Sequence, residues 1–409
     1  MGGGGAVCER LCAAWSGRAD VRVTVLGTGP HAPVGVDYHC VAVPPRGLPP
    51  TRLSELAYAG LCRQFERACT AWIEHQTDVS VVIAHDISEG PDFARLATGC
   101  IPVMTLVHVD VVEYFTKMYM RGWVSPEGAA RFFARLRPWP VVPDVLRLVF
   151  DKQHDAYHHS ACVVLPSASM GDVVRRCYPR VNPARLAVVG WGAPDQAPRA
   201  GQVEAARQEL AAEWGLRPDE KVLLTLSRIS PEKGQDRLLE AVRHAEAANA
   251  AGPGFRVVIC GGSAFMQGES FLRQLRRAAG RLRTPVVFAG HLEGARKRAA
   301  LEMAHVFVAA SRHESYGLTT MEAFAAGTPV VAVDSHGARA TVDDSCGRIV
   351  PTGPRLPARL WLQLETLLAD ASLRARLGAG ARARADRARF ADAAEQLVSL
   401  ATRLSSAWR

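Results

Sequence analysis

The sequence predicts an α/β protein made of two doubly wound domains in tandem. Strand-sized apolar segments alternate with amphipathic segments of helix length along the whole chain. Alternation of this kind favours parallel sheets with helices on both faces. The chain has 409 residues, of which 48% are hydrophobic and 22% charged, which is enough for two ordinary globular domains.

The strand-like segments divide into an early and a late series. The early series comprises residues 21–27, 79–85 and 101–108, and the late series comprises residues 222–227, 255–260, 285–289 and 330–333. Residues 392–406 predict one more amphipathic helix at the end of the chain.

A stretch rich in proline and glycine, WGAPDQAPRAG at residues 191–201, separates the two series. We place the boundary near Pro194, which gives an N-terminal domain at residues 1–193 and a C-terminal domain at residues 194–385. Residues 386–409 are expected to pack back toward the first domain. In such domains, ligands bind at the carboxyl ends of the strands.

The composition argues against several classes of protein. The apolar runs are far shorter than the roughly 20 residues that span a bilayer, and the start MGGGGAVCERLCAAW lacks a secretory signal, so we expect a cytoplasmic protein. The ten cysteines show no CxxC spacing, which predicts neither a disulfide framework nor a structural metal site. The charge of +9 fits either an anionic ligand or solvated arginines, and no nucleic-acid-binding motif accompanies it.

The segment VLLTLSRISPEKGQDRLLEAV reads as a buried strand, a short loop and a helix that begins at Ser230. This places Lys233 in the first helical turn, where a cation opposes the helix dipole. An anion bound jointly with Arg228 would relieve that conflict. The alternative is that both are ordinary loop cations that pair with Glu232 or Asp236.

The segment SRHESYGLTTMEAFAAGTPVVA predicts a loop, a short helix over residues 318–326 and a stop at the following glycine. Free backbone N–H groups at the helix start form an anion site, and they belong to Gly317, Leu318 and Thr319. Glu314 lies before the helix and Glu322 inside it. Taken singly, Glu314 reads as a solvated loop residue and Glu322 as an acid that is favourable near a helix start. Two carboxylates around a phosphate site, however, favour a sugar nucleotide as the ligand.

These segments resemble the retaining glycosyltransferases of family 4, which have the GT-B fold of two facing Rossmann-like domains. The resemblance rests on SRISPEKGQDRLLEA, on the spacing of Glu314 and Glu322, and on AFAAGTPVVA, and it covers roughly residues 222–351. It implies that Arg228 and Lys233 hold the donor diphosphate, that Glu322 binds the ribose hydroxyls and that Glu314 contacts the donor sugar. The loop at residues 290–292, with Leu292, would lie against the base.

The resemblance is weaker in the N-terminal half. LVHVD resembles the strand end at which family members place a histidine beside the donor sugar, here His108, with Asp110 as a residue that orients the acceptor. Asp86 is a weaker acceptor candidate, together with its neighbours His85 and Glu89. A lone histidine at a strand end is more often structural. Ser167 reads as a helix cap and not as a nucleophile.

Two features depart from the family pattern or lie outside it. Family members begin with a strand that leads into a glycine-rich loop, whereas this chain starts at Gly2 to Gly5. The first strand is therefore expected to be missing, which means either that the true start lies upstream or that the sheet tolerates a lost strand. The alternative reading of Gly2 to Gly5 is an ordinary flexible terminus. The basic and aromatic segment at residues 129–155 could contact a membrane surface or an anionic acceptor. We favour packing of its apolar residues on the first sheet, without stable membrane insertion.

The predicted function is retaining transfer of a hexose from a nucleotide sugar, with UDP or GDP as the favoured nucleotide, to a hydroxyl acceptor. The acceptor classes left open are a cyclitol- or aminoglycoside-like metabolite, a lipid and a glycan. No metal or other cofactor is expected, because cations and backbone amides would stabilise the leaving diphosphate. The alternatives are a sugar-nucleotide epimerase or a phosphorylase of the same fold, or a non-catalytic sugar-nucleotide-binding subunit.

Overall fold

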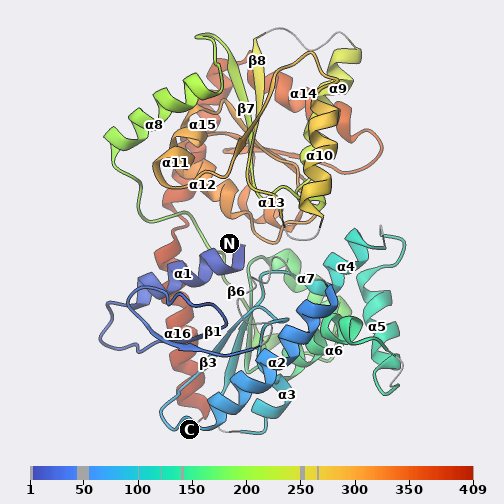
Figure 1. Ribbon diagram of the computed structural model, residues 1–409, viewed down its shortest axis with the longest axis vertical. Coiled ribbons are helices and arrows are strands. Elements are labelled where there is room, and N and C mark those ends of the chain that lie inside the picture. Colours follow the sequence, from blue (N-terminus) through green and yellow to red (C-terminus); the bar gives the residue numbers. More distant parts are fainter. Residues whose placement is uncertain are drawn as a thin grey trace. The chain divides into compact units, whose positions relative to one another are not determined.

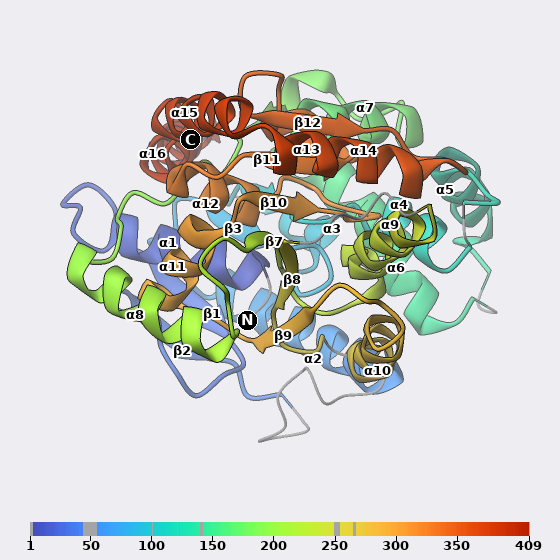
Figure 2. The same ribbon diagram turned by 90° about the horizontal axis from the view of Figure 1, so that it is seen from above.

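The computed structural model describes residues 3–43, 55–99, 101–120, 122–139, 142–248, 254–264 and 267–408. The chain divides into two compact units, and Figures 1 and 2 show their elements. Unit 1 contains Met1–Gly190 and Ala391–Arg409, and unit 2 contains Trp191–Phe390. None of the described helices is both long enough and apolar enough to cross a membrane.

Unit 2 is built around a six-stranded parallel sheet in the order β12-β11-β10-β7-β8-β9. Its strands are β7 (Lys221–Leu226), β8 (Phe255–Cys260), β9 (Val286–Gly290), β10 (Val306–Ala309), β11 (Val330–Val333) and β12 (Gly347–Val350). The chain runs outward from β7 to β9 and then returns to β10 on the other side of β7. The loops after β7 and β10 therefore flank the point where the strand order reverses, which is where open α/β sheets bind ligands.

Helices cover both faces of this sheet, as Figure 1 shows, with α8, α11, α12 and α15 on one side and α9, α10 and α14 on the other. Their bounds are α8 (Ala200–Glu213), α9 (Gln235–Ala247), α10 (Gly268–Ala279), α11 (Gly294–Met303), α12 (Leu318–Ala326), α13 (His336–Thr341), α14 (Leu356–Ala369) and α15 (Ala371–Asp386). The inner strands β7, β8, β10 and β11 are largely buried, as expected for a parallel sheet that is covered on two faces, whereas the edge strands β9 and β12 are partly exposed.

Unit 1 contains a four-stranded parallel sheet in the order β3-β4-β5-β6 and a separate parallel pair, β1 and β2. The strands are β1 (Thr24–Gly27), β2 (Asp37–Cys40), β3 (Val82–His85), β4 (Val103–Leu106), β5 (Cys162–Leu165) and β6 (Leu186–Val188). The helices are α1 (Gly3–Trp15), α2 (Glu55–Glu74), α3 (Phe93–Leu96), α4 (Val111–Met118), α5 (Pro126–Leu136), α6 (Asp144–His159), α7 (Ala168–Cys177) and α16 (Phe390–Trp408).

The two ends of the chain meet within unit 1. The indole Nε1 of Trp15, at the end of α1, donates a hydrogen bond of 3.3 Å to the carbonyl oxygen of Ala394 in α16. Figure 1 shows the two helices side by side. Gly3 to Gly5 form the first turn of α1, so these glycines are not a flexible terminus, whereas Gly2 lies outside the described residues.

Candidate functional site

Unit 2 brings the loops that carry Arg228, Lys233 and Glu314 together at the point where the strand order reverses. The loop after β7 carries Arg228 and Lys233, and the loop after β10 carries Glu314 and leads to α12. The two loops touch closely, because a Cβ atom at Gly234 would lie 2.2 Å from the carbonyl oxygen of Ala310. Only glycine fits at that contact.

The sequence predicted that Lys233 lies in the first turn of a long helix. The structure does not confirm this. Pro231–Lys233 form a single 3-10 turn that ends at Gly234, whose φ of 66° is left-handed, and α9 starts only after it. Ser230 makes no side-chain capping bond. The helix dipole therefore does not oppose Lys233 in the way expected, because the contact at Gly234 breaks the helix.

The ammonium of Lys233 instead pairs with Glu314. Its Nζ lies 2.7 Å from Oε2 of Glu314, and the two side chains are 18% and 24% exposed. Ser311 Oγ donates a weaker hydrogen bond of 3.4 Å to the same oxygen. Burial by itself would raise the pKa of Glu314, but the charge and hydrogen bond of Lys233 hold that pKa below its ordinary value. Glu314 is thus a carboxylate at neutral pH.

The N-terminus of α12 is open to an anion. Its N-cap is Gly317, with φ of 93°, and no side chain caps the following N–H groups. Leu318 and Thr319 are half-buried in the first turn, so their N–H groups lie at the end of the helix that attracts negative charge. Gly337 also contacts Glu314, and the sequence did not predict this contact. Its N–H donates to the Glu314 carbonyl oxygen at 2.7 Å, and a Cβ atom at Gly337 would lie 2.7 Å from Glu314 Cγ.

Glu322 lies within α12 and is 7% exposed. Its Oε1 accepts a hydrogen bond of 2.9 Å from Lys297 Nζ of α11, and this lysine was not singled out from the sequence. Leu292, between β9 and α11, is 5% exposed.

Arg228 is nearly half exposed, and its Nη2 lies 3.6 Å from Glu232 Oε1. Pairing with Glu232 is the ordinary alternative to anion binding for this arginine. The N–O distance of that pair is long, so the guanidinium stays accessible.

Unit 1 places His108 after β4 and His85 at the end of the neighbouring strand β3. Nδ1 of His85 and Nε2 of His108 lie 3.3 Å apart, and the rings stack with centroids separated by 5.4 Å. Burial lowers the pKa of His108 to about 4. Burial and the neighbouring His108 lower the pKa of His85 to about 3. Both rings are therefore neutral at pH 7, and one donates a hydrogen bond to the other.

Asp110 has a structural position, in which donors from the protein itself bond to both of its carboxyl oxygens. It is fully buried, it caps α4 by accepting from the backbone N–H of Glu113 at 2.8 Å, and the same Oδ1 accepts from Gln153. Its other oxygen accepts from the hydroxyl of Tyr157 at 2.9 Å. Burial raises the pKa of Asp110. Because protein donors occupy both oxygens, Asp110 fixes the loop that carries His108.

Asp86 follows His85 and is the only non-glycine residue with positive φ, at 91°, in the described part of the chain. Such a backbone is strained and persists only where the surroundings hold it. Lys152 holds the loop: its Nζ donates to the carbonyl oxygens of Ser88 and Gly90 at 3.1 and 2.7 Å. Burial raises the pKa of Asp86 to about 6 and also raises that of Glu89.

The first turn of α1 packs directly on His108. A Cβ atom at Gly4 would lie 3.2 Å from Cδ2 of the imidazole ring. Since Gly4 and His108 are far apart in the sequence, this contact could not be read from a local pattern. It brings the glycine-rich start of the chain to the same place as the histidine pair.

Replacing Gly4 with alanine should lower activity while leaving stability almost unchanged. Alanine favours a helix over glycine by about 1 kcal/mol, but its methyl group would push His108 by a few tenths of an ångström. Steady-state kinetics and thermal unfolding of Gly4→Ala should show a fall in kcat at a similar Tm. Gly60→Ala is the control, because a Cβ there meets nothing within 4 Å. Full activity in Gly4→Ala would mean that the ring position is not critical.

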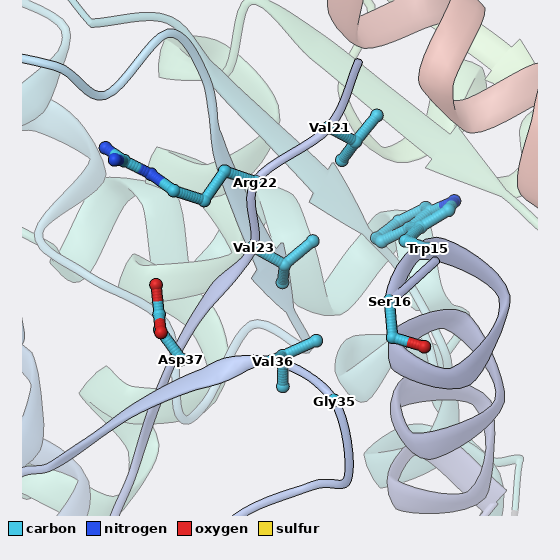
Figure 3. Close-up of a pocket in the computed structure, with 8 residues that line it drawn as sticks. All are labelled: Trp15, Ser16, Val21, Arg22, Val23, Gly35, Val36 and Asp37. Carbon is cyan, nitrogen blue, oxygen red and sulfur yellow. The ribbon is translucent and has the colours of Figure 1, made fainter. Parts of the chain in front are cut away.

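A cavity of about 360 Å³ lies elsewhere in unit 1, between the end of α1 and the start of β2. Figure 3 shows Trp15, Arg22 and Asp37 around it. Gly4 and Trp15 lie at opposite ends of α1, so this cavity is separate from the histidine pair and contains none of the predicted site residues.

Comparison with known proteins gives the family. The profile described as glycosyl transferases group 1 matches residues 206–384. The chain is 32% identical over 353 residues to the D-inositol 3-phosphate glycosyltransferase of Stackebrandtia nassauensis, covering 78% of this chain and 76% of the relative. It is 36% identical over 167 residues to the phosphatidyl-myo-inositol mannosyltransferase of Mycobacterium leprae, covering 40% and 41% of the two chains.

Solved structures agree on the fold. The sucrose-phosphate synthase from Thermosynechococcus elongatus superposes with a TM-score of 0.75 at 20% identity, covering 100% of this chain and 94% of the other. Anabaena HepE, solved in complex with UDP and glucose, gives a TM-score of 0.69 at 16% identity, covering 98% and 96%. The predicted fold class is confirmed as GT-B. This chain belongs to the group 1 glycosyltransferases.

Proposed function

We propose that this glycosyltransferase moves a hexose from a nucleoside diphosphate sugar to a hydroxyl acceptor, with retention of the anomeric configuration and without a metal ion. The observation that carries the proposal is the pair of Lys233 and Glu314, 2.7 Å apart, beside the uncapped N-terminus of α12. A cation, a carboxylate and free N–H groups at one point match a ligand that combines phosphate with sugar hydroxyls.

The donor diphosphate would bind to Lys233, Arg228 and the first N–H groups of α12. An ammonium has three N–H donors, and Glu314 occupies one of those of Lys233, so the others remain for phosphate oxygens. As the bond to the sugar breaks, negative charge grows on the diphosphate. Fixed cations and amides that face this charge stabilise the transition state, which is the task a divalent ion performs in other enzymes.

The remaining residues of unit 2 would bind the rest of the donor. Glu322 accepts hydrogen bonds from the ribose hydroxyls, and Lys297, whose Nζ lies 2.9 Å from Oε1, orients the carboxyl group. Leu292 provides an apolar contact for the base. Glu314, held as a carboxylate by Lys233, contacts the hexose near the reacting carbon.

In unit 1, His108 would act as a neutral hydrogen-bonding group for the donor sugar. The lowered pKa values of His108 and His85 support this role, because a neutral ring can donate to one partner and accept from another. Asp86 is the remaining acceptor candidate. Retention follows the family resemblance, in which the acceptor attacks from the face of the leaving group and the leaving phosphate oxygen takes its proton.

The names of the relatives support a polyol or lipid-linked polyol acceptor, and the UDP complex of HepE supports a UDP-type donor. GDP sugars remain in the test set. The acceptor is proposed at the level of a hydroxyl compound: a cyclitol- or aminoglycoside-like metabolite, a lipid or a glycan.

Thermal unfolding with UDP, GDP, ADP and dTDP sugars tests the donor site. A donor at 100 times its Kd should stabilise the folded protein by about 2.7 kcal/mol. The gain should be lost in Lys233→Ala and in Glu322→Ala and kept in Lys221→Ala, which changes a lysine at the opposite end of β7. Stabilisation that survives in both site variants would contradict the proposed site.

Turnover with the stabilising donor then tests the chemistry. Proton NMR of the product should show the anomeric configuration of the donor, and the rate should be unchanged by EDTA. An inverted product or a rate that depends on added Mg²⁺ would contradict retention or metal independence respectively.

A further inference from the structure

The segment that contains α5 and the residues flanking it in unit 1 exposes an unusual amount of aromatic surface. Among the described residues, eleven large hydrophobic side chains are exposed, and five of them lie within the 21 residues from 119 to 139. Trp123 is 89% exposed, Trp139 60% and Phe132 56%, and Tyr119 and Val124 are the other two. Figure 1 shows α5 at the periphery of unit 1, beyond α4 and α6.

The inner side of α5 accounts for the packing that the sequence predicted. Ala129 and Ala130 are buried, and Phe133 stacks on Phe150 of α6 with ring centroids 3.7 Å apart. Phe132 contacts the ring of Phe133 edge-on, with centroids 5.4 Å apart, but Phe132 and Trp139 both stay more than half exposed. A solvated helix face that needs no partner is polar, whereas packing within the chain leaves more than half of Trp123, Phe132 and Trp139 exposed.

Cations lie between these rings. Arg131 and Arg135 are one helical turn apart and exposed on α5. Among the described residues, the neighbouring cations Lys117 and Arg137 are paired, with Glu113 and Asp155 respectively. No ion pair or hydrogen bond of Arg131 or Arg135 occurs in the described part of the chain. Their charge is therefore available to an external anion.

We propose that Trp123, Phe132, Trp139, Arg131 and Arg135 form a surface, the aromatic–arginine surface, that adsorbs reversibly to an anionic lipid bilayer. Trp side chains prefer the headgroup level of a membrane, where the ring is buried and the indole N–H stays hydrated. Trp123 precedes α5 and Trp139 follows it, and the two arginines lie on the helix between them, so α5 would lie along the bilayer surface. Unpaired arginines complement anionic headgroups. Shallow adsorption of this kind requires no spanning segment.

A second copy of the chain fits this surface less well. In a two-fold symmetric dimer the same patch meets itself, which would bring Arg131 and Arg135 close to their own copies. Like charges that are buried together at an interface are costly. The charge pattern therefore favours a lipid surface over self-association.

Co-sedimentation of the full chain with vesicles tests the proposal. The protein should bind vesicles of phosphatidylglycerol and phosphatidylcholine, bind those of phosphatidylcholine alone much more weakly, and be released by salt. Arg131→Ser with Arg135→Ser should lower the partition coefficient about 25-fold, at about fivefold for each arginine. Trp123→Ser with Trp139→Ser should lower it at least about tenfold. All these positions are exposed, so Tm should not change.

Matched controls lie in unit 2. Arg273→Ser with Arg277→Ser removes two exposed arginines at the same spacing on α10, and Leu362→Ser removes a side chain that is 56% exposed. Neither should change binding more than about twofold. The proposal is overturned if the wild type does not bind anionic vesicles, if the α10 variant loses binding equally, or if light scattering shows a dimer that the Trp variants dissociate. None of these readouts depends on transferase activity.

Discussion

Replacing Lys233 with methionine should lower kcat/KM at least about 100-fold, because it removes a fixed positive charge at the place where the leaving diphosphate becomes more negative. It also leaves the carboxylate of Glu314 without its partner at 2.7 Å. The pair is only partly buried, so the loss of stability should be limited to about 1–3 kcal/mol. Steady-state kinetics and urea unfolding of the same preparation measure the two effects.

Two further variants separate catalysis from stability. In Lys233→Met with Glu314→Gln, the unpaired carboxylate is gone, so stability should recover while activity stays low. Arg256→Met breaks a comparable ion pair with Glu220, 3.0 Å long, at the opposite end of β7 and β8. It should cost about 3 kcal/mol and leave kcat/KM of the folded enzyme within about twofold of wild type. If Lys233→Met behaves like Arg256→Met, the Lys233 pair has only a structural role.

The sequence was most informative where local patterns determine structure. The strands at 255–260 and 330–333 and the helix at 318–326 have the predicted bounds, because apolar runs and a glycine stop are local signals. Ser167 caps α7 as predicted, with Oγ accepting from Met170 N–H. The family resemblance came from the same C-terminal half.

Predictions of local structure from the sequence failed where a tertiary contact decides the local conformation. The helix expected at Lys233 is broken by the contact of Gly234 with the Ala310 carbonyl, and these two residues are far apart in sequence. Strand β2 (Asp37–Cys40) was not predicted, since DYHC is short, polar and mostly exposed. The pairing of Lys297 with Glu322 joins two helices and has no local pattern.

Asp110 is a case in which a usable signal was present. An aspartate followed three residues later by Glu113 is the pattern of a helix N-terminus, and Asp110 does cap α4. Its other partners, Gln153 and Tyr157, lie one turn apart on α6 and could not be assigned to it from sequence. The cap by itself was enough to predict a structural role.

Replacing His85 with glutamine should remove a large part of the stability loss that acid causes between pH 6.5 and pH 4. The pKa of His85 is lowered to about 3 in the folded protein, whereas an unfolded histidine titrates near 6.5. Below pH 6.5 the unfolded chain therefore gains a proton that the folded chain does not. Stability falls with pH by up to about 1.4 kcal/mol per unit for this histidine, until the folded pKa is reached.

His108, with a pKa of about 4, contributes in the same direction. Asp86 acts in the opposite direction, because a carboxyl whose pKa is raised to about 6 binds a proton more readily when folded and so adds stability as pH falls from 6 toward 4. The wild-type curve mixes these effects. The informative quantity is therefore the difference in unfolding free energy between wild type and His85→Gln at each pH.

Urea midpoints at pH 7.5, 6, 5 and 4.5, at a constant denaturant slope, measure that difference. His85→Gln should be slightly less stable than wild type at pH 7.5, because the hydrogen bond to His108 is altered, and should overtake it as the pH falls. His31→Gln, at an exposed position, should follow wild type throughout. A difference that does not change with pH would mean that His85 is not held neutral, and the case for a neutral His108 in the donor site would lose its physical basis.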